Sequence, residues 1–276
     1  MTTPTLEGIV HGLPEADYHA DPALSSTQVK WLIETPAHYR WNLDHPQEHK
    51  TTFDLGSAVH TKVLGTGWDV VEIQFENWTT KPAREARDAA YADGLIPILS
   101  KDLAVIDLMA ESVLTHPEAR ARFEDTQPEV SVFATEPATG LGLRCRFDRL
   151  RDDLRWAVDL KTSTSAATKS AFGKTVWNYG YHVSRAHYLD TVELVTGERP
   201  EMLFVVVEKN PPYLTGVFRL SNDQIQMGET QARAARAELR WCLDNDTWPG
   251  RASGVQITET PMGQVYEFTD RYERAA

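Results

Sequence analysis

The sequence predicts a mixed α/β domain with one central sheet flanked by helices. Apolar residues recur at mainly helical spacing through the first 115 residues, and the spacing changes to alternation between 129 and 161. A continuous apolar run follows at 202–208, which is typical of a central strand buried on both faces. The predicted order is therefore helices, three strands, a helix, two strands and a final helix.

The N-terminal part is predicted to be helical after an extended start. We expect residues 1–24 to form a turn-rich lead-in. Ser25 or Ser26 can cap a helix that ends at Pro36, because a serine hydroxyl accepts hydrogen bonds from the free N–H groups of a first turn. A second short helix is expected over 38–43.

A third helix carries a histidine on one face. Residues 55–64 place apolar side chains at helical spacing, and Gly65 and Gly67 stop the helix. Gly56 and His60 are four residues apart, so they share a face. The small residues before His60 would allow this helix to approach a sheet closely. A lone histidine here is either a packed side chain or a ligand.

Three more elements precede the alternating region. Residues 69–75 are predicted to form a strand, and residues 81–92 a helix with charges of both signs. Residues 100–115 are predicted to form an amphipathic helix capped by Ser100.

The alternating region predicts a three-strand antiparallel meander with short turns. Its strands are expected over 129–134, 141–148 and 156–161. Because side chains alternate between the faces of a strand, Asp159 and Lys161 share one face, and Asp148 lies on the polar side of the preceding strand.

The C-terminal part predicts a long helix, two strands, a second long helix and a tail of weak strand character. The helices are expected over 175–195 and 222–243, and the strands over 202–208 and 213–220. We expect a single domain over 1–276, with a helical lead-in to residue 50, a core over 51–245 and a tail from 246.

Composition excludes several classes of protein. The 28 basic and 40 acidic residues give a net charge of −12, which argues against coating nucleic acid with the whole surface but leaves room for a local basic groove. Two cysteines, Cys145 and Cys242, are too few for a disulfide framework or a four-cysteine zinc or iron–sulfur site within one chain. No apolar run is long enough to span a bilayer, and no secretory signal is visible, so we expect a cytoplasmic protein without a membrane partner.

The meander carries the strongest chemical pattern. Asp148 and Asp159 on adjacent strands can share Mg²⁺, which prefers oxygen ligands. Lys161 beside the ion can orient or deprotonate the attacking water, and Glu129 on the first strand can add a carboxylate. The plainer interpretation is a salt bridge between ordinary half-exposed strand residues.

The segments GLRCRFDRL and AVDLKTS, with their aspartates 11 positions apart, resemble the nuclease motif of the PD-(D/E)xK superfamily. LGSAVHTKVLG resembles the Gly-x-x-x-His motif of its RecB-like branch, and YGYHVSRAHYLDTV resembles the helix after the catalytic lysine. Three stretches resemble phage and prophage RecE-type exonucleases in particular: YHADPALSSTQVKWLIETPAHYRW, HPEAR and PEVSVFATEPATGLGLRCRFD. The resemblance runs in order from Tyr18 to Phe218.

The resemblance implies a fold and a set of roles. It implies a PD-(D/E)xK nuclease-like mixed central sheet. Asp148, Asp159 and the Leu160 carbonyl would hold Mg²⁺ or Mn²⁺, with Glu129 and His60 as further ligands and all four side chains counted as catalytic. Lys161 would be the catalytic lysine that positions the water.

The resemblance also places DNA contacts on the helix after the lysine. Tyr188, Tyr181, Ser184 and Arg185 are the candidates. Ser184 departs from the family, which has glutamine there, so the reach of an amide is lost.

Other candidate DNA contacts come from the residues themselves. Arg144, Arg146, Arg149, Lys169 and Lys174 can contact phosphates or form internal salt bridges.

Three aromatic residues follow these lysines. Trp177, Tyr179 and Tyr181 can stack on unpaired bases, although we expect core packing for Trp177.

The leading hypothesis is a RecE-like exonuclease that degrades the 5′-ended strand of linear double-stranded DNA. The 3′ overhangs would serve recombination through a single-strand annealing partner of the RecT type, and the family implies a homo-oligomer such as a tetramer. Such a protein, if phage-encoded, would act in the cytoplasm of a bacterial host.

Three alternatives remain open. One is a structure-specific endonuclease of the same fold; the iron–sulfur Cas4-like version is excluded by the cysteine count. Another is an inactive DNA-binding module. The third is an iron(II) enzyme that uses His19 and Asp21 with a distal histidine, His182 or His187, which the helix content disfavours.

Overall fold

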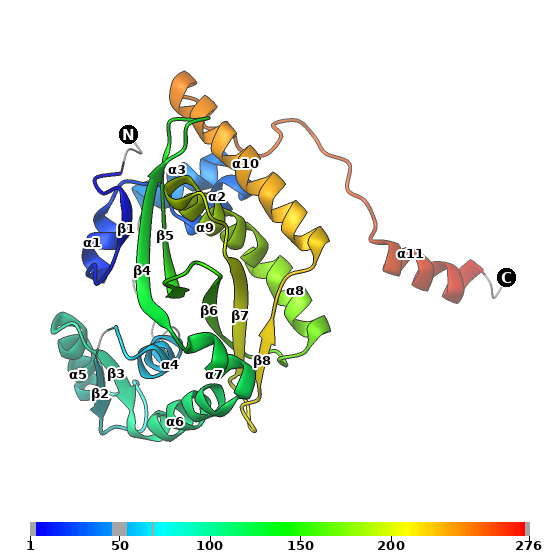
Figure 1. The fold of residues 1–276 in the computed structure, drawn as a ribbon. Helices are drawn as coiled ribbons and strands as arrows, with labels where there is room; N and C mark the ends of the chain where they lie inside the picture. Colours follow the sequence, from blue (N-terminus) through cyan, green and yellow to red (C-terminus); the bar gives the residue numbers. More distant parts are fainter. Residues whose placement is uncertain (1–3, 46–53, 68, 274–276) are drawn as a thin grey trace.

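The chain folds around a six-stranded mixed sheet, as the sequence predicts (Figure 1). The computed structural model describes residues 4–45, 54–67 and 69–273, so the predicted boundary at residue 50 lies outside the described residues. The strands lie in the order β1 (Gly8–Val10), β4 (Thr126–Thr135), β5 (Gly142–Arg151), β6 (Trp156–Ser163), β7 (Glu201–Glu208) and β8 (Thr215–Phe218). Neighbours are antiparallel except β6 and β7, which are parallel.

The predicted antiparallel meander is confirmed as β4, β5 and β6, but its second pair is short. Strands β4 and β5 pair along most of their length. Within the described chain, β5 and β6 pair only at Arg149↔Val158 and Leu150↔Ala157. The ladder between the two strands therefore does not continue to Asp148 and Asp159.

The predicted N-terminal helices are confirmed as α2 (Ser26–Glu34) and α3 (Pro36–Asp44). Ser25 caps α2, and its side chain exchanges hydrogen bonds with Gln28 in a capping box. The lead-in differs from the expected irregular chain. It forms the edge strand β1 and a short helix α1 (Glu15–Ala20), because β4 offers free backbone groups at the edge of the sheet.

A small second sheet lies beside the first. It pairs β2 (Val70–Ile73) in parallel with β3 (Ile96–Leu99), and its helices are α4 (Asp54–Leu64), α5 (Lys81–Ala92) and α6 (Ser100–Thr115). The sequence predicts all of these except β3, which is only four residues long and contains Pro97.

Two details around α6 differ from the sequence-based expectation. Ser100 is not the cap: β3 runs directly into α6, so Leu99 occupies the cap position and no side chain caps the helix. A further helix, α7 (Pro117–Phe123), follows α6 and was not expected.

The single long helix predicted over 175–195 is wrong. The chain forms α8 (Lys169–Tyr179) and α9 (Tyr181–Thr196), separated by Gly180 in a left-handed conformation with φ of 65°. A side chain at Gly180 would place its Cβ 2.8 Å from Cδ of Lys30, so the turn also needs glycine for space. Trp177 is 58% exposed at the end of α8, so the expectation of core packing for this residue is also wrong.

The C-terminal part ends in helices. After β7 and β8, as predicted, α10 (Asn222–Asn245) packs against α9 and α2. The tail forms α11 (Met262–Phe268) and a π-helical turn (Thr269–Glu273) where the sequence suggested weak strand character. Figure 1 shows α11 at the end of an extended segment, away from the sheet.

Helices cover both faces of the main sheet. On one face, Val158 and Leu160 of β6 pack in a core with residues of α4 and α6. On the other, Phe147 of β5 and Phe204 of β7 pack with residues of α8 and α9. Asp148 of β5 and Asp159 and Lys161 of β6 lie where these two strands are no longer paired with each other.

Candidate active site

Asp148 bridges the gap between β5 and β6. Its Oδ2 accepts a hydrogen bond of 2.6 Å from the backbone N–H of Leu160, in place of the ladder hydrogen bond that the separated strands lack. His60 on α4 approaches the same oxygen, with Nε2 at 3.4 Å. His60 Nδ1 lies 2.9 Å from the Gly56 carbonyl, which can only accept, so Nδ1 donates and Nε2 faces the carboxylate.

The Asp148–His60 contact shifts both pKa values toward the charged forms. Burial would lower the pKa of His60, but its hydrogen bond to Asp148 and the charge of that carboxylate raise it. Burial would raise the pKa of Asp148, but His60, Lys161 and the Leu160 N–H hold it below its usual range. Each of the two groups therefore favours the charged form of the other.

Asp159 and Lys161 form the second charged pair, on β6. Asp159 is 7% exposed, and its Oδ2 forms an ion pair with Lys161 Nζ. Burial and the charge of Asp148 raise the pKa of Asp159. Although burial would lower the pKa of Lys161, Asp159 and Asp148 raise it above its ordinary value. Lys161 is thus protonated near neutral pH, and it can hold a water or steady negative charge rather than accept a proton.

Glu129 lies on β4, opposite Asp148 of β5, in a strained backbone conformation. Its φ is 51°, in the left-handed region that non-glycine residues rarely occupy. The neighbouring pairs Pro128↔Arg149 and Val130↔Phe147 continue the ladder on either side. Burial and the charge of Asp148 raise the pKa of Glu129 to about 7, so this carboxyl titrates near neutral pH.

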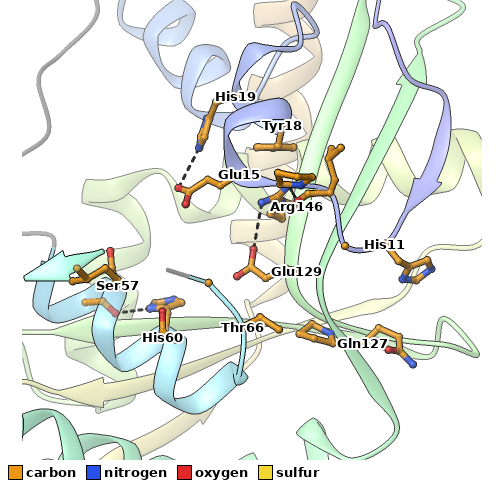
Figure 2. A pocket seen from close by; sticks show the side chains of 18 of the residues that line it. His11, Glu15, Tyr18, His19, Ser57, His60, Thr66, Gln127, Glu129 and Arg146 are labelled. Atoms are coloured by element: carbon orange, nitrogen blue, oxygen red, sulfur yellow. Dashed lines mark hydrogen bonds and ion pairs between the residues drawn. The ribbon is translucent and has the colours of Figure 1, made fainter. Parts of the chain in front are cut away.

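A cavity of about 900 Å³ adjoins this charged centre (Figure 2). His60 and Glu129 line it, whereas Asp148, Asp159 and Lys161 are not among its lining residues. The opposite wall comes from the lead-in and α1, with Tyr18, Glu15 and His19. Nothing in the sequence indicated that this wall packs near β4 and α4, although Tyr18 begins the family resemblance and His19 was a candidate ligand of an iron site.

The predicted DNA-contacting residues on α9 divide into two groups. The Tyr181 ring lies beside the lysine, with Lys161 Nζ 5.4 Å from its centroid. Tyr188 packs edge-on against Phe147 at 5.2 Å, and Ser184 is half-buried in the first turn of α9. Arg185 lies elsewhere: its side chain is 12% exposed and pairs with Glu229 of α10 at 3.6 Å.

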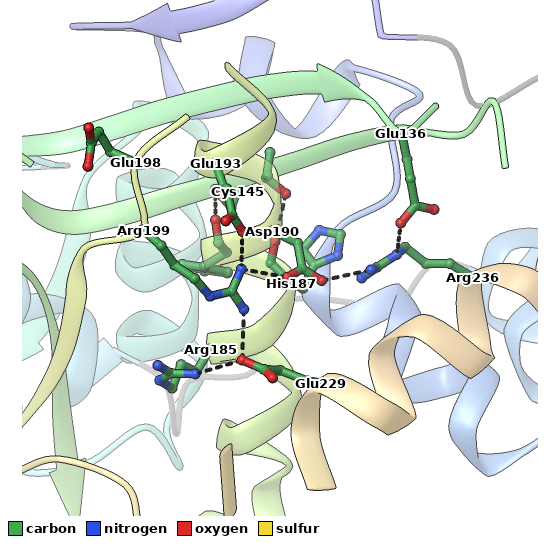
Figure 3. Close-up of polar contacts among 12 residues, drawn as sticks. Glu136, Cys145, Arg185, His187, Asp190, Glu193, Glu198, Arg199, Glu229 and Arg236 are labelled. Carbon is green, nitrogen blue, oxygen red and sulfur yellow. Dashed lines mark hydrogen bonds and ion pairs between the residues drawn. The ribbon is translucent and has the colours of Figure 1, made fainter. Parts of the chain in front are cut away.

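Arg185 belongs to a network of charges that joins α9 to α10 (Figure 3). Arg199 bridges Glu229 and Asp190, and Arg236 bridges Asp190 and Glu136. Each buried guanidinium thus faces at least one carboxylate, which offsets the cost of burying it. The network holds the helices behind the sheet and is separate from the Asp148–Asp159 centre.

The three arginines around Asp148 are engaged within the protein. Arg144 donates to the carbonyl of Tyr18, Arg146 to that of Leu13 and Arg149 to that of Leu64. These hydrogen bonds hold the lead-in and α4 against β5. The three arginines thus make contacts within the protein, which was the alternative to phosphate contacts. Lys169 and Lys174 are exposed on α8.

The residues suggested for an iron site do not converge. Asp21 accepts hydrogen bonds from Thr5 and Ala23. His182 contacts the Val176 carbonyl and Gln231, and His187 donates to the Arg144 carbonyl at 3.0 Å. His19 lies beside Glu15. These four residues thus have different partners within the protein, and none of these contacts joins them to one another.

The donor set of the charged centre suits a hard divalent cation. In the described part of the chain, no three His, Cys, Asp or Glu side chains converge closely enough to hold an ion as they stand. Asp148, Asp159 and the Leu160 carbonyl nevertheless present oxygen atoms from two strands at one place. Oδ2 of Asp159 is buried and has no hydrogen bond beyond its ion pair, so it is available as a ligand.

Two comparisons with known proteins bear on this arrangement. The model of a PDDEXK-like domain of unknown function, DUF3799, matches residues 25–261. A crystal structure from Eubacterium rectale, described as a "putative exonuclease", is similar with a TM-score of 0.60 and 13% identity, covering 93% of this chain and 98% of that one. The crystal structure of LHK-Exo in complex with dAMP has a TM-score of 0.28 and 14% identity over 92% of this chain and 95% of that one.

No curated protein matches the sequence significantly. None of the described helices is both long and apolar enough to span a membrane.

Proposed function

Because the chain belongs to the PDDEXK-like DUF3799 family, we propose that it is a divalent-metal-dependent nuclease that acts on DNA. One observation carries the proposal. Asp148, Asp159 and Lys161 come from two strands that separate at these residues, and they form one coupled group of charges. Ordinary half-exposed strand residues do not require two strands to part around them.

The proposed ligands are Asp148, Asp159 and the Leu160 carbonyl, with Glu129 and His60 as further ligands. A bound Mg²⁺ or Mn²⁺ would supply Lewis-acid activation of water and neutralise charge on the scissile phosphate. Lys161 donates N–H groups, so it holds the attacking water by its lone pair and stabilises negative charge that develops on the phosphate.

Glu129 exchanges a proton near neutral pH. Its pKa is about 7, so it must lose that proton before it can serve as a ligand. It reaches the adjoining cavity, so solvent can exchange with it there.

The finer proposal is a RecE-like exonuclease. We propose that it degrades the 5′-ended strand of linear duplex DNA, and that its product serves a single-strand annealing protein of the RecT type. The description of the Eubacterium rectale protein supports an exonuclease over an endonuclease. A homo-oligomer, such as a tetramer, belongs to the same proposal by analogy with the family.

Among the α9 residues, we propose Tyr181 and Tyr188 as contacts near the substrate. Tyr181 lies against Lys161, and the pKa of the half-buried Tyr188 is raised by desolvation and, to a smaller extent, by nearby groups that include Asp159 and Asp148. Ser184 remains a candidate DNA contact because it lies on the same helix. Arg185 is engaged with Glu229, so we assign it to the network behind the sheet instead.

The deciding experiment compares linear duplex DNA with covalently closed circular duplex, in Mg²⁺, Mn²⁺ or EDTA, with label at the 5′ or the 3′ end. We expect metal-dependent loss of the linear DNA alone, with early release of the 5′ label. Cutting of the closed circle would instead indicate a structure-specific endonuclease. No cleavage with either metal would indicate a DNA-binding module and overturn the proposal.

A further inference from the structure

Three aromatic rings form a stack that leads from the core to the surface beside Lys161. Phe204 of β7 is buried, and the Tyr181 ring stacks on it with centroids 6.0 Å apart and planes at 16°. The Tyr179 ring stacks on Tyr181 in turn, at 5.7 Å and 20°. Because both spacings lie within the range of offset stacking, the three rings present near-parallel planes.

The outermost ring of this stack is exposed. Tyr179 is 63% exposed, although one of its faces already packs on Tyr181. An exposed aromatic ring that packs on a half-buried one costs less entropy to engage, since its orientation is restricted. The free face of Tyr179 is therefore a prepared surface for one more flat ring.

The stack passes beside the charged centre. The middle ring, Tyr181, has Lys161 Nζ 5.4 Å from its centroid. Lys30 of α2 lies near the outer ring: its Nζ is 3.4 Å from the Tyr179 carbonyl, and its charge interacts with Lys161 and Asp159. A flat ligand on Tyr179 would thus be separated by the Tyr179 ring from Tyr181, the ring that Lys161 contacts.

The chain around this stack is unusually free of negative charge. Residues 160–189 contain no aspartate or glutamate, although 40 of the 276 residues are acidic and about four would be expected in such a stretch. The same stretch includes the exposed Lys169 and Lys174 on α8. This stretch therefore adds no negative charge of its own that would repel a polyanion.

From the three stacked rings and the absence of acidic residues from 160–189, we infer that Tyr179 is a stacking platform for an unpaired base of single-stranded DNA. A base in a duplex has both faces covered by its neighbours, whereas an unpaired base can place one face on an aromatic ring. The inference rests on the proposed nuclease function and deepens it, because it names an unpaired strand as what the site receives.

Binding measured without cleavage tests the platform. Fluorescence anisotropy in EDTA would compare a labelled, non-self-complementary single strand with a blunt duplex. Tyr179→Ala should weaken single-strand binding about tenfold, with less than a twofold change for the duplex. Tyr179→Phe keeps the ring and should bind like the wild type, because stacking does not need the hydroxyl.

A matched control comes from α11. Tyr266 is 67% exposed, close to the value for Tyr179, so Tyr266→Ala removes a similar side chain away from the stack and should leave binding unchanged. A Tyr179→Ala variant that binds single strands like the wild type would overturn the inference. So would equal losses for single strand and duplex, or a wild type that binds no single strand.

The outcomes separate this inference from the proposed function. A wild type that binds single strands through Tyr179 but cleaves nothing would overturn the nuclease and leave the platform standing. A wild type that cleaves DNA, with normal single-strand binding by Tyr179→Ala, would overturn the platform alone.

Discussion

The close contact between α9 and α10 predicts how the substitution of one glycine changes the stability of the protein. Gly228 on α10 lies directly against the backbone of His182 on α9. A Cβ added at Gly228 would lie 2.2 Å from the His182 carbonyl oxygen and 2.5 Å from its carbon. Both distances are far inside van der Waals contact, and neither atom belongs to a flexible side chain that could move away.

The Gly228→Ala substitution should therefore destabilise the fold. Alanine gains about 1 kcal/mol over glycine in a helix interior. The steric conflict must be relieved by moving two packed helices apart, and overpacking of this kind costs about 1–3 kcal/mol, or more where backbone meets backbone. We expect a net loss of about 2 kcal/mol in the free energy of unfolding, with a melting temperature lower by about 5 °C.

Gly173 provides the matched control, since it is also inside a helix, α8. A Cβ there would meet only Gln224 Nε2, at 3.9 Å, which is an ordinary contact. Gly173→Ala should stabilise the protein by about 0.5–1 kcal/mol through helix propensity alone. Urea unfolding of the two variants should thus give opposite signs. Equal or increased stability of Gly228→Ala would refute the reasoning about the helix contact.

Three further predictions concern the charged centre and one buried histidine. Lys161→Ala should abolish cleavage in Mg²⁺ but keep DNA binding in EDTA, because the lysine acts on the water; cleavage at the wild-type rate would remove it from the mechanism. Mg²⁺ at a hundred times its Kd should stabilise the wild type by about 2.7 kcal/mol. A thermal melt with and without Mg²⁺ should show this gain, and Asp159→Asn should lose it; a persisting gain would place the ion elsewhere. Burial and Arg236 lower the pKa of His187 from 6.5 to about 4. This histidine therefore contributes stability that is complete above pH 6.5 and falls by about 3 kcal/mol as the pH drops to 4, because the unfolded chain binds the proton first. Urea unfolding across this range should show a flatter pH dependence for His187→Gln, and an unchanged slope would assign the acid sensitivity to other groups.

Local patterns in the sequence were sufficient for β4 to β8 of the main sheet and for most helices. The alternation around Asp148 and Asp159 predicts two antiparallel strands, since a half-buried strand must place apolar residues on one face. Ser25 identifies the start of α2 because capping depends on residues within one turn. The motif spacing likewise pointed to Asp148, Asp159 and Lys161 as a group.

Other features depended on contacts between distant segments. Gly180 itself marks the break, because glycine readily takes the left-handed conformation of a helix end, but its contact with Lys30, 150 residues earlier in the chain, exists only in the folded structure. Trp177 is exposed beside the same break. Likewise, β1 forms only because the edge of β4 is free to pair with it.

The site itself shows the same division. The sequence by itself led to the proposal of Asp148, Asp159 and Lys161 as the candidate site, because residue type and strand period decide which charged side chains can share a face. Only the tertiary structure decided their charge states and neighbours: the separation of β5 and β6, the strained φ of Glu129, the contact of His60 with Asp148, and the engagement of Arg185 by Glu229. The physical reason is that pKa shifts, cavities and ion pairs depend on distances between groups that are far apart along the chain, and those distances exist only once the helices and the sheet have packed.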